Sequence, residues 1–148
     1  MFQSILVVCV GNICRSPVGE RVLQAGLPGC RVGSAGLGAV VGSGADPKSA
    51  AAAAARGIGL EGHVARQFTA QLAGDYELIL TMEPGHRDDI QRRYPQLSGR
   101  VMLFDQWGAR AGIPDPHGRP AEAHEQAVAQ ILEAAEGWIS RLGPRAAR

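Results

Sequence analysis

The sequence predicts a three-layer α/β fold, in which a parallel sheet has helices on both faces. Two observations support this prediction. Short apolar runs with the length of strands alternate with longer segments in which apolar residues recur at helical spacing. Several helical segments also open on a proline, as at Pro47, Pro84 and Pro120, and proline suits the first turn of a helix. Repeated strand-then-helix units form parallel sheets, because right-handed crossovers place the helices over the faces.

The first half of the chain contains two predicted strands and two predicted helices. Residues 3–9 form an apolar run typical of a buried strand, and residues 16–27 carry apolar side chains on one helical face. Residues 30–35 predict a short second strand. After a glycine-rich stretch, residues 48–56 predict an alanine-rich helix that Gly57 ends.

The second half repeats this pattern. Residues 76–82 predict a third strand, and residues 84–94 predict a helix that follows it directly. Residues 100–104 predict a fourth strand. A loop over residues 108–119 then leads to a long last helix over residues 120–142, whose apolar residues recur at helical spacing.

Length and composition limit the class of protein. At 148 residues, the chain fits one domain over residues 1–148 with a single substantial core. Its net charge of +1 gives no sign of a nucleic-acid partner, and no apolar stretch has the roughly 18 residues of a membrane span. The three cysteines are an odd number, and two lie in one loop, which argues against a disulfide framework. We therefore expect a monomeric protein of the cytoplasm with no direct membrane insertion.

A cysteine and an arginine separated by five residues follow the first predicted strand. Cys9 ends the apolar run, and Arg15 and Ser16 stand where the first helix is predicted to begin. The loop between them would lie at the amino end of a helix, where free N–H groups and the helix dipole favour an anion and a Cys9 thiolate beneath it. Arg15 adds a planar fork that binds two phosphate oxygens. The other loop residues predicted to contact phosphate or substrate are Val10, Gly11, Asn12, Ile13, Cys14 and Ser16.

Two other interpretations of this loop are weaker. A lone cysteine at the end of an apolar strand is often an inert core thiol, but the neighbouring glycine, the Arg-Ser pair and the helix start favour a reactive one. A nucleotide-binding loop would end in Gly-Lys-Ser or Gly-Lys-Thr, and the only lysine, Lys48, lies elsewhere. The loop is therefore predicted to hold phosphate above a nucleophilic thiolate.

Cleavage of a phosphate ester by a thiolate needs a proton donor for the leaving oxygen. Asp115 is the predicted donor, because Pro114 and Pro116 hold it in a stiff loop beyond the fourth predicted strand. The alternative is a simple turn aspartate, which is common beside proline. The presence of Cys9 and Arg15 favours the catalytic interpretation.

Two further polar residues are predicted to support the loop. Ser34, at the end of the second predicted strand, is placed to bond Asn12 across neighbouring strand ends, and asparagine tolerates the positive φ that a curled loop often demands. His63 is interpreted as a structural histidine that buttresses the loop. The histidines and cysteines have no metal-ligand spacing along the sequence, so no metal is expected.

Four motifs together resemble the low-molecular-weight protein tyrosine phosphatases. They are Cys9-x5-Arg15-Ser16 at the extreme amino terminus, Ser34-Ala35-Gly36, His63-Val64-Ala65-Arg66-Gln67 and Asp115-Pro116. The likeness covers almost the whole chain. The stretches that look like the bacterial subgroup paired with tyrosine autokinases of capsule and exopolysaccharide synthesis are residues 2–17, 34–39, 44–47, 60–63 and 78–83.

The resemblance implies a four-stranded parallel sheet, with the phosphate loop after the first strand, and hydrolysis of protein phosphotyrosine in two steps. Cys9 would attack phosphorus to give a phosphocysteine while Asp115 protonates the leaving phenol, and water would then release phosphate. Arg15 and the loop amides would stabilise the phosphoryl oxygens, and the residues that would hold the loop and the thiolate in place are Asn12, Ser16, Ser34 and His63. The resemblance also implies substrate contacts from Leu37 and His117, no cofactor, and a membrane-anchored tyrosine autokinase as partner.

One position departs from the family pattern, and three related functions are alternatives. The residue after Asp115-Pro116 is usually aromatic, commonly tyrosine, whereas here it is His117. Protein-arginine phosphatases carry threonine where this chain has Ile13, and the more apolar rim suits a phenyl ring better. Arsenate reductases use a cysteine pair after the third strand that this chain lacks. A noncatalytic phosphotyrosine-binding module would be expected to lack Cys9 or Asp115.

The curled loop also brings Cys14 near Cys9. We hypothesise that peroxide oxidises Cys9 and that Cys14 traps the product as a reversible disulfide. The alternative is that Cys14 only packs beneath the loop.

Overall fold

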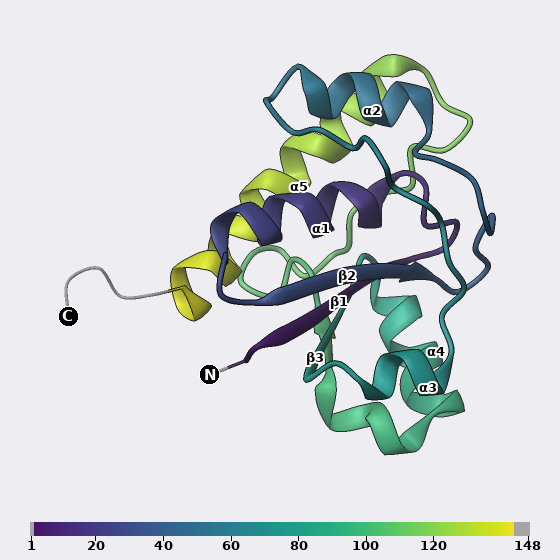
Figure 1. Ribbon diagram of the computed structural model, residues 1–148, viewed down its shortest axis with the longest axis vertical. Coiled ribbons are helices and arrows are strands. Elements are labelled where there is room, and N and C mark those ends of the chain that lie inside the picture. The colour runs from purple at the N-terminus through teal and green to yellow at the C-terminus, as the bar shows by residue number, and fades with distance from the viewer. Residues whose placement is uncertain (1, 144–148) are drawn as a thin grey trace.

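The computed structural model describes residues 2–143 and contains a four-stranded parallel sheet (Figure 1). The strands lie in the order β2-β1-β3-β4. Their bounds are Ser4–Cys9 for β1, Arg31–Gly36 for β2, Leu78–Thr81 for β3 and Val101–Leu103 for β4. Because every pair of neighbouring strands is parallel, the carboxyl ends of all four strands meet at one edge of the sheet.

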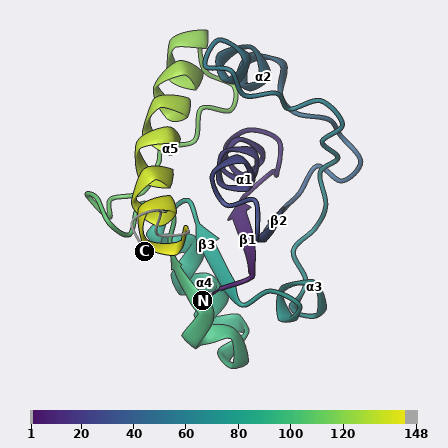
Figure 2. The ribbon, with the colours of Figure 1, turned by 60° about the vertical axis from the view of Figure 1, so that its left-hand side comes forward.

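Helices cover both faces of the sheet, which confirms the predicted three-layer fold. One outer layer contains α1, α2 and α5, and the other contains α3, α4 and the short 3₁₀ helix η1 (Figures 1 and 2). The helix bounds are Arg15–Gly26 for α1, Pro47–Ala54 for α2, Ala70–Gly74 for α3, Pro84–Arg93 for α4, Pro95–Arg100 for η1 and Ala121–Leu142 for α5. None of these helices is both long enough and apolar enough to cross a membrane.

β1 forms the centre of the core. Ile5 and Val7 belong to the apolar cluster on the side of α1 and α5, and Leu6 and Val8 belong to the cluster on the opposite side. None of the four side chains is exposed to solvent. A strand buried on both faces needs apolar residues at every position, so its sequence is a continuous apolar run instead of an alternating one. Cys9 therefore stands at the end of a fully buried strand.

α1 lies close to the sheet because Gly19 has no side chain. A Cβ atom there would come within 3.1 Å of the side chains of Met82, Phe104 and Val7. α5 packs beside α1, and Trp138 of α5 donates from Nε1 to the Phe104 carbonyl at 2.9 Å. These contacts hold the amino end of α1 near the carboxyl edge of the sheet.

Two short helices are absent from the sequence-based prediction. α3 begins after Thr69, whose hydroxyl accepts the Leu72 N–H at 3.0 Å, and η1 begins at Pro95 just after α4. They have five and six residues, too few for an apolar period to be recognised. The bounds of the other elements agree with the predicted ones to within two residues.

Candidate active site

The predicted phosphate loop lies at the carboxyl edge of the sheet. Cys9 is the last residue of β1 and pairs with Gly36 at the end of β2, and Arg15 is the first residue of α1. Both Cys9 and Arg15 are buried. α1 has no side-chain cap and no acidic residue in its first turn. The partial positive charge at its amino end is therefore available to an anion.

The five carbonyl groups of residues 9–13 all accept hydrogen bonds from outside the loop. In chain order, the donors are the N–H groups of Leu37, Gly38 and Val40, the Nε2 of His63 and the N–H of Asp46. Because the carbonyl and the N–H of a peptide unit point in opposite directions, these bonds turn the N–H groups of the loop inward. His63 must donate to the Asn12 carbonyl, 2.6 Å away, so its Nε2 carries a proton.

Asn12 holds the centre of the loop. Its φ is 59°, in the left-handed region that asparagine tolerates. Its Oδ1 accepts the Arg66 N–H at 2.9 Å, and its Nδ2 donates to the hydroxyls of Ser16 at 2.7 Å and Ser34 at 3.0 Å. Ser34 in turn donates to Glu20 Oε1 at 2.6 Å. This buried amide therefore uses both of its donors and its acceptor, and Ser34 lies where the sequence analysis placed it.

Ser16 lies in the first turn of α1 and also contacts the Cys9 sulfur. The sequence analysis begins the first helix at Ser16, but α1 begins one residue earlier and Cys14 occupies the capping position. The Ser16 hydroxyl lies 2.9 Å from Cys9 Sγ. Since this hydroxyl accepts from Asn12 Nδ2, its own proton is free to be donated to the sulfur, which stabilises a thiolate.

Arg15 is held by one end of its guanidinium group. Its Nη1 donates to the Ile113 carbonyl at 2.7 Å and forms an ion pair with Glu83, which precedes α4. Its Nη2 lies 3.8 Å from Asp115 Oδ2, and its Nε has no hydrogen-bond partner among the described residues. The other edge of the guanidinium is therefore available to phosphoryl oxygens.

Asp115 faces Arg15 from the loop that precedes α5. Its carboxylate is half-exposed, and its Oδ1 accepts the His117 N–H at 3.0 Å in a short turn. The backbone of Ile113, in the same loop, donates to the Met82 carbonyl and accepts from Arg15. These bonds tie the Asp115 loop to the end of the sheet and to the buried arginine.

A pocket of about 210 Å³ opens above Cys9. The predicted residues that line it are Cys9, Val10, Gly11, Ile13, Cys14, Arg15, Asp115 and His117. Asn12 and Ser16 are fully buried and act from behind the loop. Leu37 was predicted to contact substrate, but it packs against the apolar cluster on the side of the sheet that α3 and α4 cover. The residues of this segment that line the pocket are Gly38 and Val40.

Two residues have roles at the site that the sequence analysis did not assign. A Cβ atom on Gly36 would collide with the Val10 carbonyl, so glycine is needed where β2 approaches the loop. Glu83 pairs with the buried guanidinium of Arg15. A glycine at a strand end is a recognisable sign of close backbone approach. Glu83 offered no such sign, because its partner lies far away along the chain.

Cys14 is a buried thiol in the wall of the pocket. The pKa of Cys14 is raised to about 12, and burial of the thiol is the main cause. The carboxylate of Asp46 also raises this pKa, whereas a hydrogen bond with Ser49 lowers it. Cys14 is therefore protonated at neutral pH. Cys9, Cys14 and Cys30 are all free.

The chain is similar over nearly its whole length to proteins of one family. Residues 4–147 match the family described as low molecular weight phosphotyrosine protein phosphatase. The low molecular weight protein-tyrosine-phosphatase Wzb of Salmonella typhimurium is 46% identical over 142 residues, which cover 96% of this chain and 95% of Wzb. The structure of Vibrio vulnificus Wzb in complex with benzylphosphonate has a TM-score of 0.93 at 43% identity and covers 96% of this chain and 100% of its own. The YwlE arginine phosphatase of Geobacillus stearothermophilus has a TM-score of 0.88 at 31% identity, covering 94% and 92%.

Gly36→Ala is expected to distort the phosphate loop. The added methyl group would overlap the Val10 carbonyl, and overpacking of this kind costs about 1–3 kcal/mol. Thermal unfolding should show a lower Tm, and hydrolysis of p-nitrophenyl phosphate should fall because the loop N–H groups are displaced. Gly74→Ala is the matched control, since a Cβ atom at Gly74 meets nothing within 4 Å. A Gly36→Ala protein as stable and active as the wild type would contradict this close approach.

Peroxide inactivation tests Cys14 as the resolving thiol. After peroxide, dithiothreitol should restore the wild type fully and Cys14→Ser only partly, each relative to its own untreated activity. Disulfide formation needs the Cys14 thiolate, whose pKa is raised to about 12. It should therefore become faster as pH rises from about 6.5 to about 8.5. Equal recovery of both proteins would show that Cys14 does not resolve the oxidised Cys9.

Proposed function

This chain belongs to the low molecular weight phosphotyrosine protein phosphatase family, and on that premise we propose that it hydrolyses phosphotyrosine in proteins through a phosphocysteine intermediate. The observation that supports this proposal is the arrangement of Cys9, Arg15 and Asp115 around one pocket. A sulfur nucleophile, a cation and a carboxyl group are what hydrolysis of a phosphate ester through a covalent intermediate requires.

In the first step, the Cys9 thiolate attacks the phosphorus of phosphotyrosine. The S–P bond forms while the bond between phosphorus and the phenol oxygen breaks, and a protonated Asp115 passes its proton to that oxygen. Arg15 and the inward N–H groups of the loop hold the phosphoryl oxygens. The products are phosphocysteine at position 9, the free tyrosine side chain and an ionised Asp115.

In the second step, Asp115 takes a proton from water while the water oxygen attacks the phosphocysteine phosphorus. The S–P bond breaks and its electron pair returns to the Cys9 sulfur. The Ser16 hydroxyl, 2.9 Å from that sulfur, stabilises the departing thiolate. Inorganic phosphate leaves, and Asp115 is again protonated for the next cycle.

The pocket wall favours phosphotyrosine over phosphoarginine. The apolar side chains in the pocket lining are those of Val10, Ile13 and Val40. This apolar surface suits a phenyl ring, whereas a guanidinium group keeps hydrogen-bond donors that need partners. The two phosphatases named Wzb are also more similar to this chain, at 46% and 43% identity, than the arginine phosphatase at 31%. Hydrolysis of phosphoarginine is the alternative function on this fold.

The proposed protein substrate is a membrane-anchored tyrosine autokinase of capsule or exopolysaccharide synthesis, which a monomer of this chain would dephosphorylate in the cytoplasm. The support is the resemblance to the bacterial subgroup in residues 34–39 and 44–47. Both stretches lie beside the pocket: Gly38 lines it, and the Asp46 N–H bonds the Ile13 carbonyl of the loop at 2.8 Å.

Cys9→Ser and Arg15→Ala are each expected to abolish hydrolysis of a phosphotyrosine peptide. The first removes the nucleophile and the second removes the cation that holds the phosphoryl group in the same step. The double variant should therefore be no less active than either single variant. The measurement is the initial rate of each protein on a phosphotyrosine peptide and on a phosphoarginine peptide. The loss of rate in the variants tests the mechanism, and the ratio of the two wild-type rates tests the substrate class. The wild type should hydrolyse the phosphotyrosine peptide faster.

Circular dichroism and thermal unfolding control for folding of these variants, above all for Arg15→Ala, which leaves Glu83 without its partner. Cys9→Ser should still bind the phosphotyrosine peptide and should retain its phosphoprotein substrate in a pull-down. If Cys9→Ser keeps more than a few per cent of the wild-type rate, the mechanism is wrong. Faster hydrolysis of phosphoarginine would refute the proposed substrate.

His117→Tyr should lower the KM for phosphotyrosine peptides. The His117 ring is 62% exposed at the pocket. A larger aromatic ring there should add about 1 kcal/mol of stacking, or roughly a fivefold lower KM. Steady-state kinetics on one peptide measure the change, with His117→Phe as the control that lacks the hydroxyl. A KM that rises or stays the same would show that His117 does not form the wall of the cleft.

A further inference from the structure

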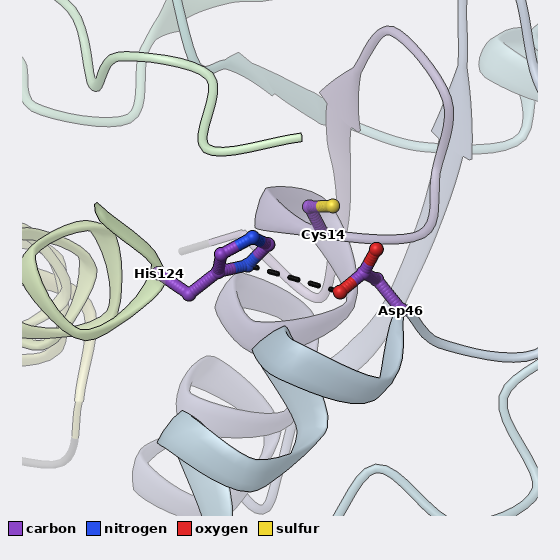
Figure 3. Close-up of side chains that lie close together, drawn as sticks. All are labelled: Cys14, Asp46 and His124. Atoms are coloured by element: carbon purple, nitrogen blue, oxygen red, sulfur yellow. Dashed lines mark ion pairs between the residues drawn. The ribbon is translucent and has the colours of Figure 1, made fainter. Parts of the chain in front are cut away.

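Three side chains able to bind a metal ion meet beside the pocket (Figure 3). Cys14 belongs to the phosphate loop, Asp46 immediately precedes α2, and His124 lies on α5. Their sulfur, carboxylate oxygen and ring nitrogen atoms all lie within 4.8 Å of one another. Cys14 and His124 are buried, and Asp46 is mostly shielded from solvent. A thiol, a carboxylate and an imidazole form a ligand set that zinc-type ions bind.

The local hydrogen bonds leave ligand atoms available. Asp46 uses Oδ1 to cap α2, accepting the N–H groups of Lys48 at 2.9 Å and Ser49 at 3.2 Å. Its Oδ2 lies outside this cap, 3.8 Å from Nδ1 of His117. His124 Nδ1 lies 2.8 Å from the Ser49 hydroxyl, whereas its buried Nε2 has no partner among the described residues.

The unpartnered nitrogen of His124 independently points to a ligand. The ring is fully buried, and its Nδ1 lies 3.9 Å from Asp46 Oδ1, the contact drawn as a dashed line in Figure 3. The ring edge that carries both nitrogens is turned toward Cys14 and Asp46 in this view. If Nδ1 donates its proton to the Ser49 hydroxyl, Nε2 of the neutral ring carries a free lone pair. Histidines that bind metal characteristically donate their other N–H to a nearby oxygen, as His124 can do here.

His117 supplies a fourth side chain. Its ring is 62% exposed and its Nδ1 already lies 3.8 Å from Asp46 Oδ2. Cys14 and His117 both line the pocket, so a cation can enter through the substrate opening. Zinc bonds of about 2.0–2.3 Å place the ligand atoms of a tetrahedral site roughly 3.3–3.8 Å apart, so the atoms of Cys14, Asp46 and His124 must approach one another by about 1 Å. His117 lies outside this group of three, and its exposed side chain must swing further inward to join them.

We propose that Cys14, Asp46, His117 and His124 form a binding site for a divalent cation of the zinc type. Thiolate and imidazole ligands favour such an ion over Mg²⁺ and Ca²⁺, which prefer oxygen ligands. The sequence analysis expected no metal, because these residues are widely separated along the chain and only the fold brings them together. The site goes beyond the proposed function, because none of the hydrolytic steps proposed above uses a cation of this kind.

The competing interpretation is that these side chains only fasten three elements together. Ser49 would then link His124 to the start of α2, and Asp46 would serve as a helix cap and nothing more. The two interpretations differ in what added metal does, because only a metal site forms a bond between the ion and the Cys14 sulfur.

Titration of the Cys9→Ser protein with Co²⁺ and Zn²⁺ tests the proposal. Without the Cys9 thiol, the remaining cysteines that could bind the ion are Cys14 and Cys30. Co²⁺ should produce a thiolate charge-transfer band in the near ultraviolet together with the intense visible bands of tetrahedral coordination. The bands should saturate at one ion per chain, and Zn²⁺ should displace the Co²⁺ and remove them.

Further substitutions in this background assign the ligands. Cys14→Ser should abolish the charge-transfer band, and His117→Ala should weaken Zn²⁺ binding by about tenfold or more. Cys30→Ser is the matched control, because the Cys30 sulfur donates to the Phe2 carbonyl at 3.2 Å, at the opposite edge of the sheet. Circular dichroism verifies the fold of each variant. His117 is exposed, so its replacement tests an imidazole ligand and leaves the core intact. Replacement of the buried His124 would disturb the core.

The outcomes distinguish the two interpretations. Absence of a thiolate band, or a band that survives Cys14→Ser, overturns the proposal. Unchanged Zn²⁺ affinity in His117→Ala overturns the four-ligand site. None of these measurements uses phosphatase activity, so their result does not depend on whether phosphotyrosine is the substrate.

Discussion

A loop that surrounds an anion must turn its N–H groups inward, and it can do so only if its carbonyls find donors elsewhere. In this chain the five carbonyls of residues 9–13 have such donors, and all five lie later in the sequence. Asn12 accepts a positive φ at the centre of the curve, and Gly36 allows β2 to approach without a Cβ atom. The anion site is therefore built by the surrounding segments as much as by the loop itself.

The same loop directs a chain of hydrogen bonds toward the sulfur. The Glu20 carboxylate can only accept, so Ser34 donates to it and in turn accepts from Asn12. Asn12 also donates to Ser16, which leaves the Ser16 proton for Cys9. Every donor in this series of hydrogen bonds thus points toward either the Glu20 carboxylate or the Cys9 sulfur. One network therefore connects the Glu20 carboxylate at one end to the buried Cys9 sulfur at the other.

Burial of Arg15 places a second constraint on the site. A guanidinium that is 1% exposed needs an anionic or carbonyl partner, and Glu83 and Ile113 supply these from two different loops. The Ile113 loop also carries Asp115. Common contacts therefore position Arg15, the proposed phosphate-binding cation, and Asp115, the proposed proton donor. Cys14 links this region to α2 and α5, since Asp46 and His124 both lie next to it.

The sequence by itself determined those features that contiguous residues create: the buried strands, the long helices and the Cys9-x5-Arg15 loop. Apolar runs and helical spacing report burial locally, so the predicted bounds agree with the structure to within two residues. The tertiary structure decided the rest. It packed Leu37 against the apolar cluster on the side of the sheet opposite α1, and it brought Glu83 to Arg15. Each of these depends on contacts between distant segments, and the free energy of such contacts leaves no periodic trace in the sequence around either partner.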